Sequence, residues 1–296
     1  MDWQGQLIAL YLFVCNQYRS ELHAYCERFT NHADLIFSDE EVITLYLFGV
    51  TQRRKQVKEI YTYANQHLRD WFPNLPRTYV AFVQRLNRVA GAFAPMTEAL
   101  LLNYPCQFEM RNNPLLIDSM PIILAHRGRR FKAKVAPEIA TNNGYCSTKK
   151  LHYYGVKLHV LAHRSSGQLP MPEYIGLTDA GMHDNKGFEQ IAPALQGNDV
   201  YGDKAYNDCF AAGEKNFNLL TPVKKEKGQK FLDVADQWLS TAVSRVRQPI
   251  ESFFNWIEDK TGIQIASKVR SYNGLMVHVF GKLAAALCIK CAIVGS

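Results

Sequence analysis

Apolar residues recur at helical spacing along the first 110 residues of the chain. Leu7, Leu10 and Val14 are three and four positions apart, the step that places side chains on one face of an α-helix. Ser38 precedes a second apolar run, and Glu41 follows it at the spacing of a capping box, which predicts that a helix begins there. We therefore expect an all-helical N-terminal domain over residues 1–110.

Two further helices are expected in this domain, over residues 56–69 and 78–89, because Pro73 and Pro76 interrupt the chain between them. The last of these helices carries Arg85 and Arg88. The short helices between residues 38 and 90 fit two interpretations, a helix-turn-helix-like DNA-binding unit and a plain helical bundle.

The pattern changes near residue 113, where short apolar runs and partial alternation replace the helical spacing. Strands are expected over residues 115–118, 153–162, 172–177, 199–203 and 218–223, with a helix over residues 205–215 before the last of them. Helices over residues 231–259 and 273–293 complete the chain. Three strands, then strand–helix–strand, then helices predict an α/β domain over residues 111–296.

The composition is that of an ordinary folded protein: 47% of the 296 residues are hydrophobic and 21% are charged, which excludes a disordered chain. The net charge of +7 is unevenly distributed. Residues 1–110 hold 10 Lys and Arg against 11 Asp and Glu, and residues 111–296 hold 24 against 16. This asymmetry indicates a polyanionic partner for the C-terminal part, or a basic surface without such a partner.

Seven cysteines at irregular spacing do not form the disulfide framework of a secreted protein. Cys288 and Cys291 form an isolated CxxC pair on an apolar segment, which favours core packing over zinc binding. Lys282 and Lys290 interrupt that segment, so we expect neither a membrane span nor a membrane partner. These features favour a reducing cytoplasm.

Three acidic residues stand in positions that suit chemistry. Asp118 and Asp203 each end a short apolar run that is expected to be a strand, and Glu251 is expected to open a helix. Acids at strand ends lie at the rim of a sheet, where open α/β folds place their sites. Carboxylates bind Mg²⁺, and two such ions polarise the attacking and leaving oxygens of a phosphodiester. The pattern therefore points to a magnesium site.

Pro249, two residues before Glu251, allows two local structures. A helix begins near Gln248, which would put Glu251 close to the positive end of a helix dipole, or a longer helix contains the proline and kinks there. Both arrangements fit the sequence.

Basic residues follow the first acid. Five lie within eight positions: Arg127, Arg129, Arg130, Lys132 and Lys134. A second group precedes Glu251 and consists of Lys224, Lys225, Lys227 and Lys230. Such side chains neutralise DNA phosphates, and the neighbouring Phe131 and Phe231 suit stacking on unpaired bases. Each group is either a DNA contact or a solvated loop.

These residues resemble the insertion-sequence transposases of the DDE type, in the branch around the insertion-sequence 982 group. The likeness covers most of the chain and is strongest over Leu115–Asp118, Tyr154–His159, Thr178–Asp184, Tyr201–Tyr206 and Arg247–Glu251. Arg247 and Glu251 retain part of a signature of the related broader group. Ser244 takes the place of its tyrosine and Glu258 the place of its lysine, with Lys260 two residues later.

The resemblance implies a ribonuclease H-like mixed sheet flanked by helices, in which Asp118, Asp203 and Glu251 form a metal-binding triad for Mg²⁺, with Mn²⁺ as a substitute. It implies DNA transposition, with cleavage at transposon ends and strand transfer into target DNA. The expected form is a homodimer on DNA in a bacterial cytoplasm, associated with the nucleoid. The residues expected to contact DNA are Arg127, Arg129, Arg130, Lys132, Lys204, Arg247 and Lys260. His183 and Asp184 are expected to support the site, the alternative being a surface histidine beside a helix-capping aspartate.

Two other functions use the same residues. One is a ribonuclease H-like DNA nuclease without strand transfer. The other is a non-cutting DNA-binding protein derived from a transposase, against which the intact triad argues. The sequence has no P-loop, GxGxxG or GxSxG motif, so ATP, dinucleotide and α/β-hydrolase chemistry lacks support.

Overall fold

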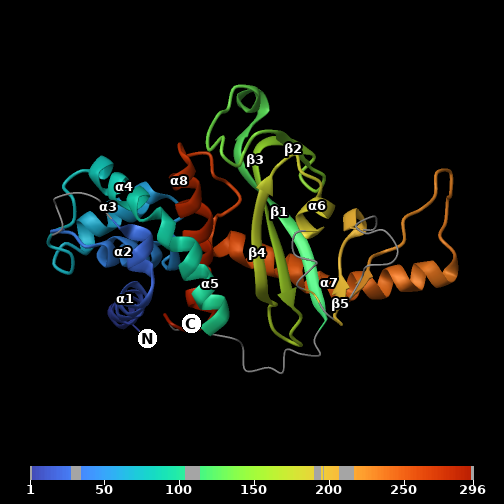
Figure 1. The fold of residues 1–296 in the computed structure, drawn as a ribbon, viewed down its shortest axis with the longest axis horizontal. Coiled ribbons are helices and arrows are strands. Elements are labelled where there is room, and N and C mark those ends of the chain that lie inside the picture. Colours follow the sequence, from blue (N-terminus) through green and yellow to red (C-terminus); the bar gives the residue numbers. More distant parts are fainter. Residues whose placement is uncertain are drawn as a thin grey trace. The chain divides into compact units, whose positions relative to one another are not determined.

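The computed structural model describes residues 2–27, 35–103, 114–189, 195, 197–206 and 217–294. The chain forms two compact units (Figure 1). The helical unit contains residues 1–104 and 257–296, and the sheet unit contains residues 105–256.

The helical unit is built from the expected N-terminal helices together with the C-terminal segment. Its α-helices are α1 (Trp3–Ser20), α2 (Asp39–Thr51), α3 (Val57–His67), α4 (Tyr79–Arg88), α5 (Phe93–Asn103), α8 (Tyr272–Met276) and α9 (Lys282–Lys290), with 3₁₀ turns at Leu22–Cys26 and Ala90–Ala92. Ser38 caps α2 as predicted. Its hydroxyl accepts the Glu41 N–H at 3.2 Å, and the Glu41 carboxylate accepts the Ser38 N–H at 2.6 Å.

Helix α2 lies at the centre of this unit, because every residue from Val42 to Val50 is buried. Helix α9 packs on α2 directly after Gly281, where a Cβ atom would lie 2.6 Å from the ring of Tyr46. A π-helical turn, Val277–Gly281, links α8 to α9. The Tyr46 hydroxyl donates to the Val277 carbonyl at 3.0 Å, which supplies a partner inside this irregular turn.

The C-terminal helices thus pack in the helical unit, which differs from the predicted division of the chain into residues 1–110 and 111–296. The reason is their apolar surface: Lys282–Cys288 is buried throughout, and α9 packs against α2 and α5. The segment Tyr272–Lys290 is long and apolar enough to cross a membrane, but 67% of its apolar window is buried, as in the core helix of a folded unit. Cys288 of the CxxC pair lies in this core.

Within the residues that the structure describes, the sheet unit contains a mixed six-stranded sheet. Its strands are β1 (Leu115–His126), β2 (Asn143–Cys146), β3 (Leu151–His163), β4 (Met171–Asp179), β5 (Asp199–Tyr201) and β6 (Asn218–Leu220). Strands β2, β1 and β4 pair antiparallel with β3, and β5 pairs parallel with both β1 and β6. An antiparallel β4–β3–β1 set that continues into parallel β5 and β6 is compatible with a ribonuclease H-like transposase core.

The two faces of this sheet have different roles. On one face, Leu115, Ile117, Leu161 and Val200 form an apolar cluster that includes Phe188 of helix α6 (Asp184–Glu189). The aromatic rings of this cluster meet edge to face, with 5.9 Å between the centroids of Phe188 and Tyr206. The other face carries Asp118, because side chains alternate along a strand.

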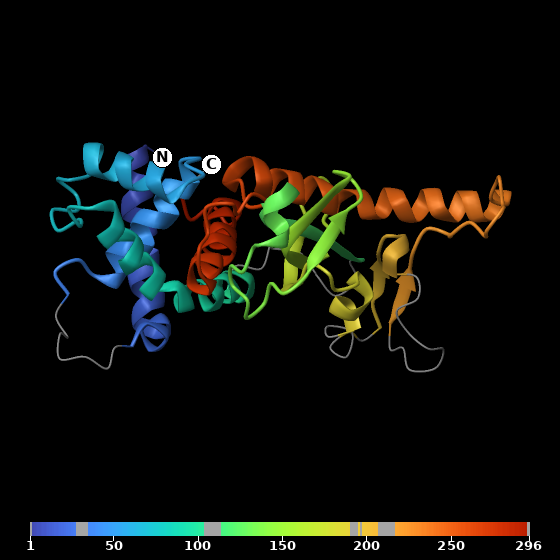
Figure 2. The same cartoon turned by 90° about the horizontal axis from the view of Figure 1, so that it is seen from above.

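Helix α7 (Val234–Thr261) contains Pro249 in its interior. A helix that begins near Gln248 is therefore excluded, and Glu251 lies in the middle of a helix instead of near its positive end. Pro249 has no N–H to donate to the Arg245 carbonyl, so the helix lacks one backbone hydrogen bond beside the candidate site. The first turns of α7 and the orange segment before them extend past the strands (Figure 2).

Most predicted strands are present, with two differences. Strand β1 runs to His126, so Asp118 is its fourth residue and does not end it. Strand β2 has no counterpart among the predicted strands, because only four residues form it. The helix expected over residues 205–215 lies mostly outside the described residues, and Lys204–Tyr206 form a 3₁₀ turn.

Candidate active site

The parallel pairing of β1 with β5 places Asp118 beside Asp203. Leu115 pairs with Val200 and Leu116 with Tyr201, a constant offset of 85 residues. The same offset relates Asp118 to Asp203, which follows the end of β5 by two positions. The charge of Asp203 adds to the raised pKa of Asp118, so the two carboxylates lie close enough to interact.

Arg247 of α7 joins Asp118 to Glu251. Its Nη1 donates to Asp118 Oδ2 at 2.8 Å, and its Nη2 pairs with Glu251 Oε1. Arg247 and Glu251 are four residues apart in the helix, so both lie on the same helical face. One arginine therefore links a strand acid to a helix acid.

The site holds more negative charge than Arg247 neutralises. Burial raises the pKa of Asp118 to about 7; Arg247 and the Ser119 N–H oppose the rise, and the charges of Asp203 and Glu251 add to it. Burial would lower the pKa of Arg247, but Asp118, Glu251 and Asp203 outweigh it and raise that pKa. A further cation is the ligand that this electrostatic balance favours.

The donor chemistry fits Mg²⁺, because Asp118, Asp203 and Glu251 offer hard carboxylate oxygens. Among the described residues, however, no three His, Cys, Asp or Glu side chains form a ready metal-binding group. Arg247 makes ion pairs with two of the acids. The structure thus brings the three acids into one neighbourhood without closing them into a ligand cluster, and their metal-binding role stays a prediction.

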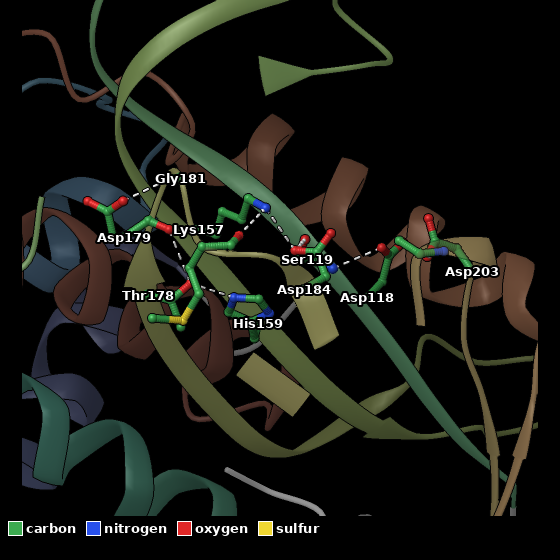
Figure 3. Close-up of polar contacts among 11 residues, drawn as sticks. Asp118, Ser119, Lys157, His159, Thr178, Asp179, Gly181, Asp184 and Asp203 are labelled. Carbon is green, nitrogen blue, oxygen red and sulfur yellow. Dashed lines mark hydrogen bonds and ion pairs between the residues drawn. The ribbon is translucent and has the colours of Figure 1, made fainter. Parts of the chain in front are cut away.

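A polar network lies next to Asp118 (Figure 3). The Ser119 hydroxyl donates to Asp184 Oδ1 at 2.9 Å, and Lys157 Nζ lies 3.1 Å from the same oxygen. Lys157 also donates to the Met182 carbonyl at 2.8 Å. The network ties β1, β3 and the start of α6 together at the residue that follows Asp118. Asp184 thus contacts the residue next to Asp118, whereas His183 is exposed, and a supporting role for either residue stays a prediction.

Helix α6 approaches the sheet closely because residue 187 is glycine. A Cβ atom at Gly187 would lie 2.8 Å from Cε1 of His159 on β3. His159 is itself buried, with its Nε2 2.7 Å from the Thr178 hydroxyl. The glycine thus allows α6 to bring Asp184 within reach of Ser119 and Lys157.

A polar cleft of about 830 Å³ opens beside Asp203. One wall contains Asp203, Lys204 and Pro222. The other is one face of α7, with Gln237, Ser240, Thr241, Ser244, Arg245, Arg247 and Gln248. These amide, hydroxyl and guanidinium groups are hydrogen-bonding partners of the kind that contact a DNA backbone.

The family comparison decides the class of protein. The model of the family described as Transposase DDE domain matches residues 111–288, more than half of the 296-residue chain. The chain belongs to this family. Comparison with curated proteins and comparison with solved structures gave no match. A transposase acts on DNA, and the matched segment contains Asp118, Asp203 and Glu251.

In this transposase the first basic group lies far along β1 from Asp118. Arg127–Phe131 form a 3₁₀ turn after the end of β1. Arg127 follows Asp118 by nine positions, which at about 3.3 Å per residue of strand corresponds to a separation of up to roughly 30 Å. The structure therefore separates Arg127, Arg129, Arg130 and Lys132 from Asp118 along β1, because the strand continues past the predicted end at residue 118. Their contact with DNA stays a prediction for a different part of the sheet unit.

The remaining predicted DNA contacts fall in different places. Lys204 is exposed and lines the polar cleft with Arg247. Lys260 belongs to the helical unit, and its contact with DNA stays a prediction.

Sequence reasoning missed Lys157, Ser119 and the polar face of α7. The polar face has a signal in the sequence: Gln237, Thr241, Ser244 and Gln248 follow each other at four, three and four positions. Lys157 and Ser119 have no such signal, because only the pairing of β1 with β3 brings them together.

Proposed function

We propose that this protein catalyses DNA transposition, with metal-dependent cleavage at transposon ends and strand transfer into target DNA. The observation that supports the proposal is the 85-residue offset in the pairing of β1 with β5, which is also the separation of Asp118 from Asp203. The ion pairs of Arg247 add Glu251 from α7 to the same neighbourhood. These are the three acids that the family resemblance assigns to the chemistry.

Asp118, Asp203 and Glu251 would hold Mg²⁺, or Mn²⁺ in its place, and the metal would polarise the scissile phosphodiester. The protein contributes a fixed charge next to the acids. Arg247 stays protonated because three carboxylates raise its pKa. Its planar guanidinium suits bidentate binding of a phosphate, so Arg247 would orient the DNA strand at this end of the cleft.

The polar face of α7 would hold the DNA backbone. Thr241, Ser244 and Gln248 line the cleft with neutral donors, and Lys204 and Arg245 add positive charge at its walls. Phosphate contacts of this kind position DNA without selecting its sequence. Sequence recognition of the transposon ends would then fall to another surface, and we assign it to helices α2, α3 and α4 as the helix-turn-helix-like unit.

Asp184 and Lys157 would act as positioning residues. Asp184 accepts a hydrogen bond from Ser119, the residue after Asp118, and Lys157 donates to Asp184 and to the Met182 carbonyl. Neither set of contacts suggests a role in bond cleavage. Within the proposal, the sheet unit supplies a ribonuclease H-like catalytic region of the insertion-sequence 982 type. Two transposon ends must be held together, so the active form would be a homodimer on DNA in the bacterial cytoplasm.

A strand-transfer assay tests this function against the nuclease alternative. The full-length protein is incubated with Mg²⁺, target plasmid and a precleaved duplex that ends in a 3′-hydroxyl and carries the terminal repeat found beside the coding DNA. Joined products support transposition. Cleavage of the uncut duplex without joining would favour the nuclease, and binding with neither reaction would favour a non-cutting DNA-binding protein.

A further inference from the structure

The helical unit contains a second cavity, separate from the acids of the sheet unit. Its volume is about 440 Å³, within the range of small-molecule pockets. The walls come from residues 46 and 55–58, from α4, and from residues 265–282. The π-helical turn contributes Val277 and His278, and turns of this kind recur at functional sites.

The lining of this pocket is strongly basic. The cationic residues that line it are Lys55, Lys58, Lys268, Arg270 and Lys282. Across the ranges that the structure describes, no Asp or Glu lines it. The pocket is therefore suited to a ligand with more than one negative charge.

Three of these cations are held in place. Arg270 Nη1 donates to the Ser267 and Val269 carbonyls at 2.9 and 2.7 Å. The stem of Lys55 packs over Gly262, where an added Cβ would lie 2.8 Å from Lys55 Cδ.

Lys282 Nζ donates to the Gly262 carbonyl at 3.1 Å, although only 3% of that lysine is exposed. Burial lowers the pKa of Lys282 to about 7 against the opposing charges of Glu258 and Glu59, so an anion in the pocket would relieve a buried positive charge.

The remaining surface of the pocket is apolar and aromatic. Val83, Leu86 and Val277 line it, and Tyr79, 37% exposed, offers a ring. Asn87 and Ser271 supply hydrogen-bonding groups beside this apolar surface. Such a surface suits a planar ring with polar edges better than a simple inorganic anion.

We propose that this pocket binds a nucleoside phosphate, with the phosphate among Lys55, Lys268 and Arg270 and the base against Tyr79 and Val83. The ligand is either a free nucleotide or an unpaired nucleotide of a DNA strand, which present the same chemistry. The inference goes beyond the proposed transposition chemistry and does not depend on Asp118, Asp203 or Glu251.

Binding of thymidine 5′-phosphate to the full-length protein, measured by calorimetry with pyrophosphate as the comparison, tests the pocket. We expect Lys268→Ala combined with Arg270→Ala to weaken thymidine 5′-phosphate binding at least about tenfold. The exposed pair Arg19→Ala and Arg88→Ala removes the same charge elsewhere in the helical unit and should leave binding unchanged. Asp203→Asn should also leave it unchanged, which separates this inference from the catalytic proposal.

Lysine labelling with mass spectrometry provides a test that needs no variant. Thymidine 5′-phosphate should protect Lys55 and Lys268, while Lys186 of the sheet unit stays reactive. If an unlabelled thymidine oligonucleotide gives the same protection, the natural ligand is an unpaired nucleotide of a DNA strand. If only the mononucleotide protects these lysines, the natural ligand is a free nucleotide. Pyrophosphate that binds as tightly as thymidine 5′-phosphate, or unprotected pocket lysines, would overturn the proposal.

Discussion

Arg247 is the single residue on which the geometry of the site depends most. Its two nitrogens contact Asp118 and Glu251 at once, which a lysine ammonium on a flexible stem does not reproduce. We predict that Arg247→Lys lowers cleavage and strand transfer about tenfold, a loss of about 1.4 kcal/mol in transition-state stabilisation, with little change in melting temperature.

Melting temperature and cleavage rate measured on one preparation check this prediction. The alternative is that Arg247 only steadies α7 against β1. In that case the lysine variant would melt at a lower temperature while its activity per folded molecule stays normal.

His278 makes the stability of the helical unit depend on pH. Burial and the charge of Lys282 lower its pKa to about 3, against the opposing hydrogen bond to the Ile263 carbonyl. Between pH 3 and about 6.5 the unfolded chain binds the extra proton, so this residue makes stability rise with pH across that window and fall on acidification.

We predict that the melting temperature of His278→Gln, which keeps a side-chain N–H, falls less than that of the wild type when the pH is lowered from 6.5 to 4. Thermal melts at both pH values provide the measurement, with His23→Gln at an exposed position as the control. An equal fall in melting temperature in the wild type and in His278→Gln would show that His278 does not cause the acid sensitivity.

At the scale of elements, helix α6 is held against β3 by the absence of a side chain at Gly187. We predict that Gly187→Ala destabilises the protein by about 1–3 kcal/mol, because the new methyl group meets the ring of His159. Displacement of α6 should also weaken the contact of Asp184 with Ser119 and reduce cleavage.

Denaturant unfolding and a cleavage assay measure the two effects of this substitution. Gly128→Ala is the matched control, because a Cβ at Gly128 meets no atom within 4 Å. Similar stability losses in both variants would argue against the packing of α6 on His159.

The 3₁₀ turn at the end of β1 carries a separate prediction. Replacing Arg129, Arg130 and Lys132 with alanine should weaken DNA binding for all sequences and reduce the salt dependence, by about 0.9 in the logarithmic slope for each phosphate that the turn no longer neutralises. Titrations at several salt concentrations measure the slope. An unchanged slope would assign this turn to the solvated surface.

Short-range sequence patterns predicted where most helices and strands lie, but they predicted the ends of the strands less well. The capping box at Ser38 and Glu41 determines where α2 begins, and that prediction is confirmed. Strand β1 continues past Asp118 because antiparallel pairing with β3 supports it up to His126, a non-local effect. Pro249 stays inside α7 for a related reason: the tertiary contacts of Ile250 and Phe253, both buried, offset the missing hydrogen bond.

At the scale of the whole molecule, the helical unit is built from two segments that are far apart in the sequence. The chain leaves the helical unit after residue 104 and rejoins it from residue 257. Apolar residues 283–288 predict a buried helix but not the surface that buries it, because α2 and α5 lie far away in the sequence. The acids were accessible to prediction through family resemblance, whereas the ion pairs of Arg247 required the fold.

The most direct measurement is Mg²⁺-dependent cleavage of a terminal-repeat duplex by the wild type and by Asp203→Asn, with DNA binding recorded in the same samples. We predict that Asp203→Asn binds DNA at least as well as the wild type and does not cut it, because one ligand oxygen and one negative charge are removed. Asp199→Asn, at an exposed position on the strand that precedes Asp203, should cut normally. Cleavage by Asp203→Asn at the wild-type rate would contradict the assignment of the active site.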